Sequence, residues 1–260
     1  MEATEIKELY FEELDLLKRI QVYRKEYDRK NLDRVEKVIL LLLYRIYSNL
    51  YSSLLLTAAA HKKGKMVLFQ LPLGIILRCT YTDCLFALYL QRVEKNRANE
   101  ELDLRKIEYA NSLLERREVY RDQVKSSGMG LEDSFIDNLW QLTMEDNFMH
   151  LLTFDDKKEK LQLTKRSKEQ LHEAGFSNLR SVTIKEQKDF LTMQEGIETL
   201  VERLYHYYKY FSQYEHFSEN GQGDILVSSQ DDGNDNIHFP SAIRALSAGV
   251  EAIISMSKNA

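Results

Sequence analysis

The chain has 260 residues, of which 30% are charged and 43% hydrophobic, with only 2 Pro and 10 Gly. This composition is typical of long helices and not of a protein built from strands and turns. The formal net charge of -5 at pH 7 and the pI near 5.8 argue against a dedicated nucleic-acid binder. The length is sufficient for one full core, with or without an extension.

The first sixty residues predict two helices. Apolar residues recur at helical spacing from about residue 4 to residue 27, so we expect a first amphipathic helix there. A second helix is expected from a cap at Asn31 to about Ala60, and its later part is nearly all apolar. The opening ten residues are acidic and already amphipathic, so they do not predict a secretory signal.

The most informative segment is a long apolar helix expected at about residues 72–92. It carries two charges, Arg78 and Asp83, in an otherwise apolar run. A helix that is apolar all round is buried on every side, which predicts that it is the centre of a bundle. Five residues correspond to about 140° around a helix, so the two charges cannot simply satisfy each other. Each charge therefore needs a partner from another helix.

Two segments are apolar enough to raise the question of a membrane. Residues 38–60 contain Arg45, and the central helix contains Arg78 and Asp83. Each charge within a span costs about 2.5–3.5 kcal/mol on insertion, which favours a soluble core and no membrane contact. The 2 Cys lie five residues apart on the central helix, too far for a disulfide, and we expect reduced thiols in a cytoplasmic protein.

The rest of the chain predicts a loop, a long helix, a linker and a final helix. The lysine-rich residues 154–168 read as loop, and a long helix is expected over 183–218. Residues 219–239 are polar and glycine-rich, which predicts a flexible loop. We therefore expect an all-α, multi-helix bundle over 1–218 and a C-terminal helix over 240–257. The apolar, alanine-rich face of that last helix should dock on the bundle or on a dimer partner.

Aromatic residues are concentrated near the end of the long helix. Tyr208, Ser212 and His216 recur at spacings that place them on one face. One interpretation is an aromatic core seam with hydroxyl groups at its rim. A sharper interpretation is that Arg78 or Asp83 faces these residues, forming a polar cluster between two helices where a ligand could bind.

The same residues carry a resemblance to a known group of proteins. Arg78 and Asp83 on a buried apolar helix, followed by Tyr208, Ser212 and His216, resemble a family of uncharacterised, all-helical bacterial proteins. Their bundles are similar to HEPN domains, which serve in toxin–antitoxin and phage-defence systems. The resemblance implies a helical bundle with Arg78, Asp83, Ser212 and His216 as its polar centre, and it implies no established activity.

Catalysis has only a weak pair of candidates in this sequence. HEPN ribonucleases use an Arg with a His four to six residues later, and Arg166 and His172 fit that spacing. There is no His-Glu-x-x-His motif, cysteine cluster, P-loop or dinucleotide fingerprint, so we expect no metal and no cofactor. A non-enzymatic binding or interaction module is the favoured hypothesis. A metal-independent ribonuclease and a small-ligand bundle with a tyrosine-lined pocket are the alternatives, with RNA, a small ligand or a second copy as candidate partners.

Overall fold

The structure is a computed structural model of the chain, and its contacts divide the chain into two compact units. Unit 1 joins residues 1–93 to residues 183–260, and unit 2 comprises residues 94–182. The sequence assigned residues 1–218 to one bundle, whereas the contacts give residues 94–182 a unit of their own. The described residues are 3–27, 31–63, 67–106, 108, 152–155, 160–173, 180–215 and 239–259.

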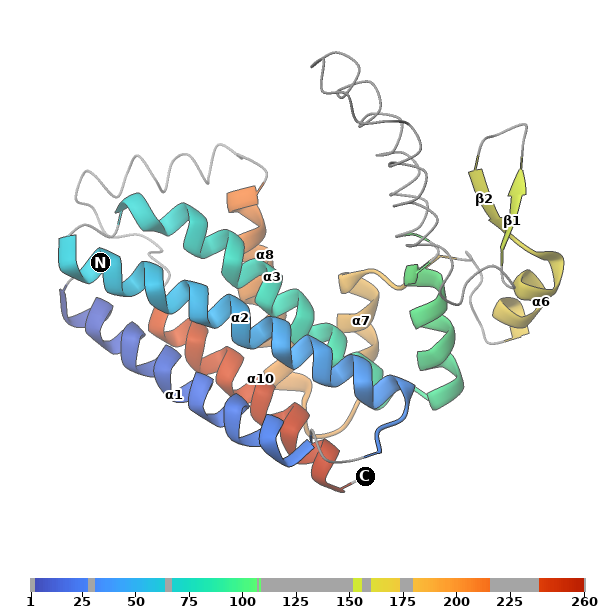
Figure 1. Cartoon of the computed structure of the whole chain (residues 1–260), viewed down its shortest axis with the longest axis horizontal. Helices are drawn as coiled ribbons and strands as arrows, with labels where there is room; N and C mark the ends of the chain where they lie inside the picture. Colours follow the sequence, from blue (N-terminus) through green and yellow to red (C-terminus); the bar gives the residue numbers. More distant parts are fainter. Residues whose placement is uncertain are drawn as a thin grey trace, which may run out of the picture. The chain divides into compact units, whose positions relative to one another are not determined.

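Unit 1 begins with a pair of long helices, α1 (Ala3–Tyr27) and α2 (Arg34–Lys63). Asp33, not Asn31, caps α2. Its Oδ1 accepts a bond from the backbone N–H of Glu36 at 2.9 Å, and its own N–H donates to Glu36 Oε2 at 2.8 Å. This reciprocal capping box fixes the start of α2. The two helices pack against each other along their apolar faces (Figure 1).

The predicted central helix is α3 (Val67–Arg92), and it lies inside unit 1. It packs against α2, α7, α8 and α10, and nearly every residue from Thr80 to Leu90 is buried. This burial confirms the prediction made from a helix that is apolar on every side. By length and composition, α2 and residues Leu71–Arg92 are each long and apolar enough to cross a membrane, a test that the core helix of a soluble protein also passes.

The last helix, α10 (Phe239–Asn259), packs against α1, α3 and α8 of its own chain (Figure 1). Its approach to α3 is close: a Cβ added at Gly249 would lie 2.6 Å from Cys84 Sγ. Only glycine therefore fits at this contact without a shift of its neighbours. At the rim, Arg244 bonds to Glu12 at 3.2 Å, and Arg19 pairs with Glu251.

The long helix expected over residues 183–218 is interrupted. Two helices, α7 (Ile184–Leu191) and α8 (Glu198–Glu215), are separated by a turn that contains Gly196 with φ of 82°. That backbone conformation is in the left-handed region, which glycine adopts without steric cost. The continuous helical pattern of the sequence concealed this break.

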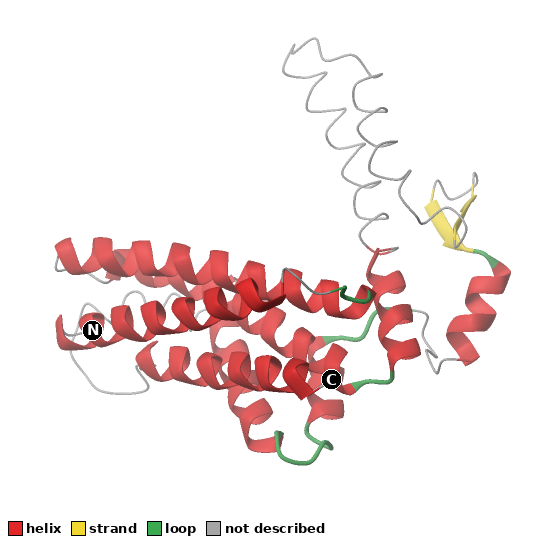
Figure 2. Cartoon of the chain, turned by 60° about the horizontal axis from the view of Figure 1, so that its bottom comes forward, coloured by secondary structure: helices red, strands yellow, loops and turns green. Residues whose placement is uncertain are grey.

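Unit 2 contains the strands found in the described part of the chain (Figure 2). Strands β1 (Leu152–Asp155) and β2 (Lys160–Leu163) pair antiparallel, with Leu152 opposite Leu163. They are followed by helix α6 (Lys165–Glu173). The prediction of a loop over residues 154–168 was therefore wrong, since the alternating apolar residues of both segments support a short hairpin. The all-α bundle that the sequence predicted is unit 1.

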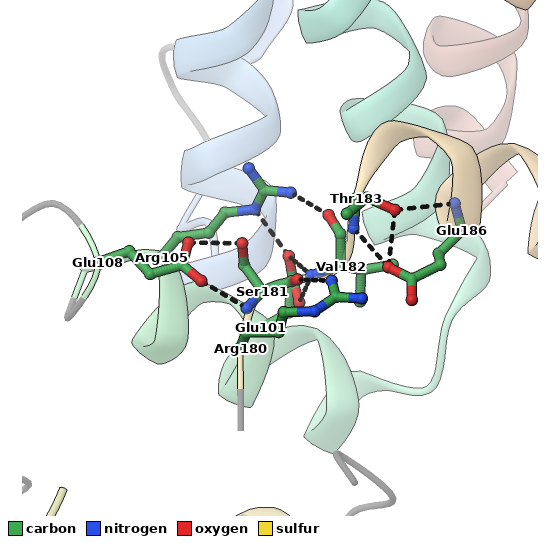
Figure 3. A network of polar contacts seen from close by, with 8 residues as sticks. All are labelled: Glu101, Arg105, Glu108, Arg180, Ser181, Val182, Thr183 and Glu186. Carbon is green, nitrogen blue, oxygen red and sulfur yellow. Dashed lines mark hydrogen bonds and ion pairs between the residues drawn. The ribbon is translucent and has the colours of Figure 1, made fainter. Parts of the chain in front are cut away.

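Within unit 2, residues 180–182 are attached to the helical segment that includes residues 95–106 (Figure 3). The buried Glu101 carboxylate accepts the Val182 N–H at 3.0 Å and the Arg105 Nε–H at 2.7 Å. Arg105 also donates to the Val182 carbonyl at 3.0 Å, and Glu108 accepts both donors of Ser181. These bonds satisfy a buried carboxylate and hold two segments far apart in the sequence, which is a structural role.

Candidate functional site

Three of the predicted site residues lie together where α3 meets α8. Arg78 Nε donates to Ser212 Oγ at 3.3 Å, and the Arg78 guanidinium carbon lies 5.8 Å from the centre of the Tyr208 ring. The Ser212 hydroxyl donates in turn to the Tyr208 carbonyl at 2.7 Å. All three side chains are half-buried. We refer to Arg78, Tyr208 and Ser212 as the arginine cluster.

The neighbouring aromatic residues of α8 belong to the core. Tyr81 of α3 stacks on Tyr207 at 5.8 Å and on Phe211 at 5.9 Å between ring centres. The Tyr81 hydroxyl donates to the Ala242 carbonyl at 2.6 Å, and burial raises its pKa well above the ordinary value. This stack matches the aromatic core seam expected from the sequence, and it fixes the rotation of α8 relative to α3.

Asp83 has its partner on α2 instead of α8. It forms an ion pair with Arg45 at 3.3 Å, and its carboxylate is buried while most of the Arg45 side chain is exposed. Burial raises the pKa of Asp83 to about 6, and the positive charge of Arg45 limits that rise. Each charge of α3 thus has a partner on another helix, as the sequence predicted: Arg78 on α8 and Asp83 on α2.

The remaining candidates are dispersed. His216 lies outside the described residues. Arg166 and His172 both lie on α6 in unit 2, and both side chains are exposed. The neighbouring Glu169 is within 3.9 Å of Lys165 on the same helix. Six residues place the two side chains about 120° apart around the helix, so Arg166 and His172 do not face one point. An exposed Arg and His are ordinary on a short charged helix.

The sequence did not single out a buried carboxyl group on α1. Glu13 is fully buried against α2, where it accepts a bond from the Ser53 hydroxyl. Burial raises the pKa of Glu13 to about 8, although the hydroxyl groups of Ser53 and Thr57 lower it. The available signal was its position four residues after the buried Leu9 and seven before the buried Ile20, which places Glu13 on the apolar face.

Cysteine and metal chemistry find little support in the described residues. Both cysteines are free thiols, Cys79 half-buried and Cys84 fully buried, and burial raises the pKa of Cys84. A buried thiol with a raised pKa is unreactive. No group of three or more His, Cys, Asp or Glu side chains that could hold a metal ion occurs in the ranges that the structure describes.

Comparison of the chain with protein-family models, with curated proteins and with solved structures finds no match. The resemblance to HEPN-like bundles therefore stays a prediction from a few residues.

Proposed function

We propose that this protein is a non-enzymatic binding module, and that it binds an anionic group of its ligand at the arginine cluster. The observation that carries the proposal is the contact of Arg78 with Ser212 and Tyr208 at the half-buried junction of α3 and α8. Around this junction α3 and α8 bury apolar and aromatic side chains, so a guanidinium there stands out from its surroundings.

The chemistry of the cluster favours a carboxylate or a phosphate. A guanidinium is a rigid fork of donors that matches both groups, and partial burial strengthens the attraction because less water screens it. The Nε–H bond to Ser212 and the face of Tyr208 fix the orientation of the side chain. Because its own hydroxyl is directed at the Tyr208 carbonyl, Ser212 offers a lone pair to Arg78.

A soluble, cytoplasmic setting is part of the proposal. It is supported by the burial of α3, because 72% of its most apolar stretch lies inside the protein, and by the free cysteines. The resemblance to HEPN-like bundles supports a place in a bacterial toxin–antitoxin or phage-defence system. Ribonuclease activity is the weaker candidate, because Arg166 and His172 are exposed on one short helix.

The proposal is tested by thermal unfolding in the presence of small anions. Inorganic phosphate and acetate are compared with chloride at equal ionic strength, so that the phosphate and carboxylate forms of the ligand are distinguished. A ligand that binds only the folded protein raises its melting temperature. We expect one of the two anions to raise it by roughly 2–4 °C, which corresponds to about 1 kcal/mol for a chain of this size.

The control is a different arginine, Arg203 of α8. Phosphate also stabilises proteins without binding them, and that effect acts equally on every variant. The shift should disappear in Arg78→Ala of α3 and persist in Arg203→Ala, which removes an exposed guanidinium from α8. Equal shifts in the two variants, or no shift with either anion in the wild type, would refute the proposal. Labelled RNA incubated with the protein in EDTA should stay intact, and its cleavage would refute the non-enzymatic assignment.

A further inference from the structure

The outermost line of α2 exposes large apolar side chains at regular spacing. Leu41, Tyr51 and Leu55 are 60%, 51% and 56% exposed, and the exposed Ser48 lies between them. Leu41, Ser48 and Leu55 are each seven residues apart, so they form one straight line along the helix. We refer to Leu41, Ser48, Tyr51 and Leu55 as the α2 stripe. A partner that covered this face would remove three large apolar side chains from water.

The α2 stripe is symmetric about Ser48. Leu41 and Leu55 lie seven residues before and after it, while Arg45 and Tyr51 lie three residues before and after it. If a second α2 runs antiparallel with the two Ser48 residues facing each other, Leu41 meets Leu55 of the other copy. Arg45, whose guanidinium also pairs with Asp83 of its own chain, then lies opposite Tyr51 of the other copy on both sides, and each pair brings a cation to an aromatic ring.

We propose that the α2 stripe is a two-fold interface that binds a second copy of this chain. A two-fold interface requires one surface patch that complements itself, and this arrangement does so through Leu41 against Leu55 and Arg45 against Tyr51. The centre allows a close approach, because Ser48 is small and the Ser52 hydroxyl folds back onto the Ser48 carbonyl at 3.0 Å. The interface is separate from the arginine cluster and does not depend on its function.

The size of the α2 stripe predicts a weak dimer. Fourteen residues of helix span about 21 Å, and a helix about 10 Å wide then offers on the order of 200 Å². A stable interface needs about 800 Å² from each partner, so this contact belongs to the weak class. Dimerisation should therefore depend on protein concentration.

Sedimentation velocity from about 10 to 500 µM measures this self-association. The wild type should shift from monomer to dimer as its concentration rises, and the double variant Leu41→Ser with Leu55→Ser should remain monomeric. The matched control is Phe11→Ser on α1, where the side chain is 55% exposed, and it should dimerise like the wild type. A wild type that stays monomeric, or a double variant that still dimerises, would overturn the proposal.

A cross-link tests the predicted symmetry directly. Facing Cα atoms of two helices packed at 8–10 Å come within about 6 Å, which is inside the reach of a disulfide. Ser48→Cys should thus form a covalent dimer under mild oxidation, whereas Val22→Cys, at another exposed position, on α1, and the wild type should not. Equal cross-linking of the two variants would exclude the two-fold axis at Ser48.

Discussion

Two buried carboxyl groups contact α2, one from α1 and the other from α3, and they differ in their protonation near neutral pH. Glu13 of α1 meets the hydroxyl of Ser53, whereas Asp83 of α3 meets the guanidinium of Arg45. Burial raises the pKa of Glu13 to about 8 and that of Asp83 only to about 6. Near neutral pH, Glu13 therefore holds a proton, while Asp83 is mostly ionised and balanced by a cation.

The difference shows that the side chain facing a buried carboxyl group determines which protonation state is stable. A hydroxyl can accept from or donate to a neutral carboxyl group, so Glu13 fits its site as an acid. A guanidinium stabilises the ionised form, so Asp83 fits its site as an anion. Each group has a second oxygen, Oε2 of Glu13 and Oδ2 of Asp83, without a hydrogen bond among the described residues. Both sites should consequently make the stability of unit 1 depend on pH.

The largest effect is expected from Glu13. Its pKa is raised in the folded protein, so the folded state keeps a proton that the unfolded state loses, and stability falls as pH rises from about 4.5 to about 8. A shift of that size corresponds to on the order of 5 kcal/mol across the window. Glu13→Gln keeps the shape without the titration and should remove this fall. Urea unfolding between pH 4 and pH 9 measures it.

The matched control for Glu13 is Glu195→Gln, which changes an exposed carboxylate in the turn after α7. Its free energy of unfolding should follow the wild-type pH curve. If Glu13→Gln shows the same decline as the wild type between pH 6 and pH 8, Glu13 is ionised in the folded protein and the comparison of the two sites fails.

A smaller effect in a lower pH window is expected from Asp83. Its folded-state pKa of about 6 exceeds the ordinary 3.8, so stability should fall by about 3 kcal/mol as pH rises between these values. Asp83→Asn should make the decline below pH 6 shallower, leaving the part that Glu13 supplies, and should leave the decline from pH 6 to pH 8 intact. The same urea series measures it. A variant curve parallel to the wild type below pH 6 would contradict the assignment.

The sequence revealed one of these two acids and concealed the other. Asp83 is conspicuous because it interrupts an apolar helix, and its need for a partner on another helix followed from its burial. Glu13 lies on α1, whose other charged residues, such as Glu12 and Asp15, made one more carboxylate look like surface. The sequence did not identify Arg45 as the partner of Asp83 either, since Arg45 appears there only as a charge that interrupts an apolar segment.

Prediction from the sequence was similarly incomplete for the site and for the fold. Tyr208 and Ser212 lie on one face of α8, as their helical spacing predicted, and of the two charges expected to face them it is Arg78 that does so. Grouping Asp83 with them ignored the 140° between it and Arg78. The hairpin and the break at Gly196 were missed, because strands of four residues and a single left-handed residue leave little periodic signal.

The smallest effect is expected from the cation. Arg45→Met removes the charge that limits the pKa of Asp83, so that pKa should rise further and stability at pH 8 should fall. The loss should be about 1 kcal/mol instead of the 3–5 typical of a fully buried pair, because Arg45 is 66% exposed and water screens it.

In 1 M NaCl, where the screening length is about 3 Å, the difference in stability between Arg45→Met and the wild type should shrink. In an Asp83→Asn background the same substitution should cost almost nothing, because the interaction energy belongs to the pair. An equal loss in both backgrounds would mean that Arg45 contributes through packing along its aliphatic stem, and the contrast with Glu13 would then rest on burial alone.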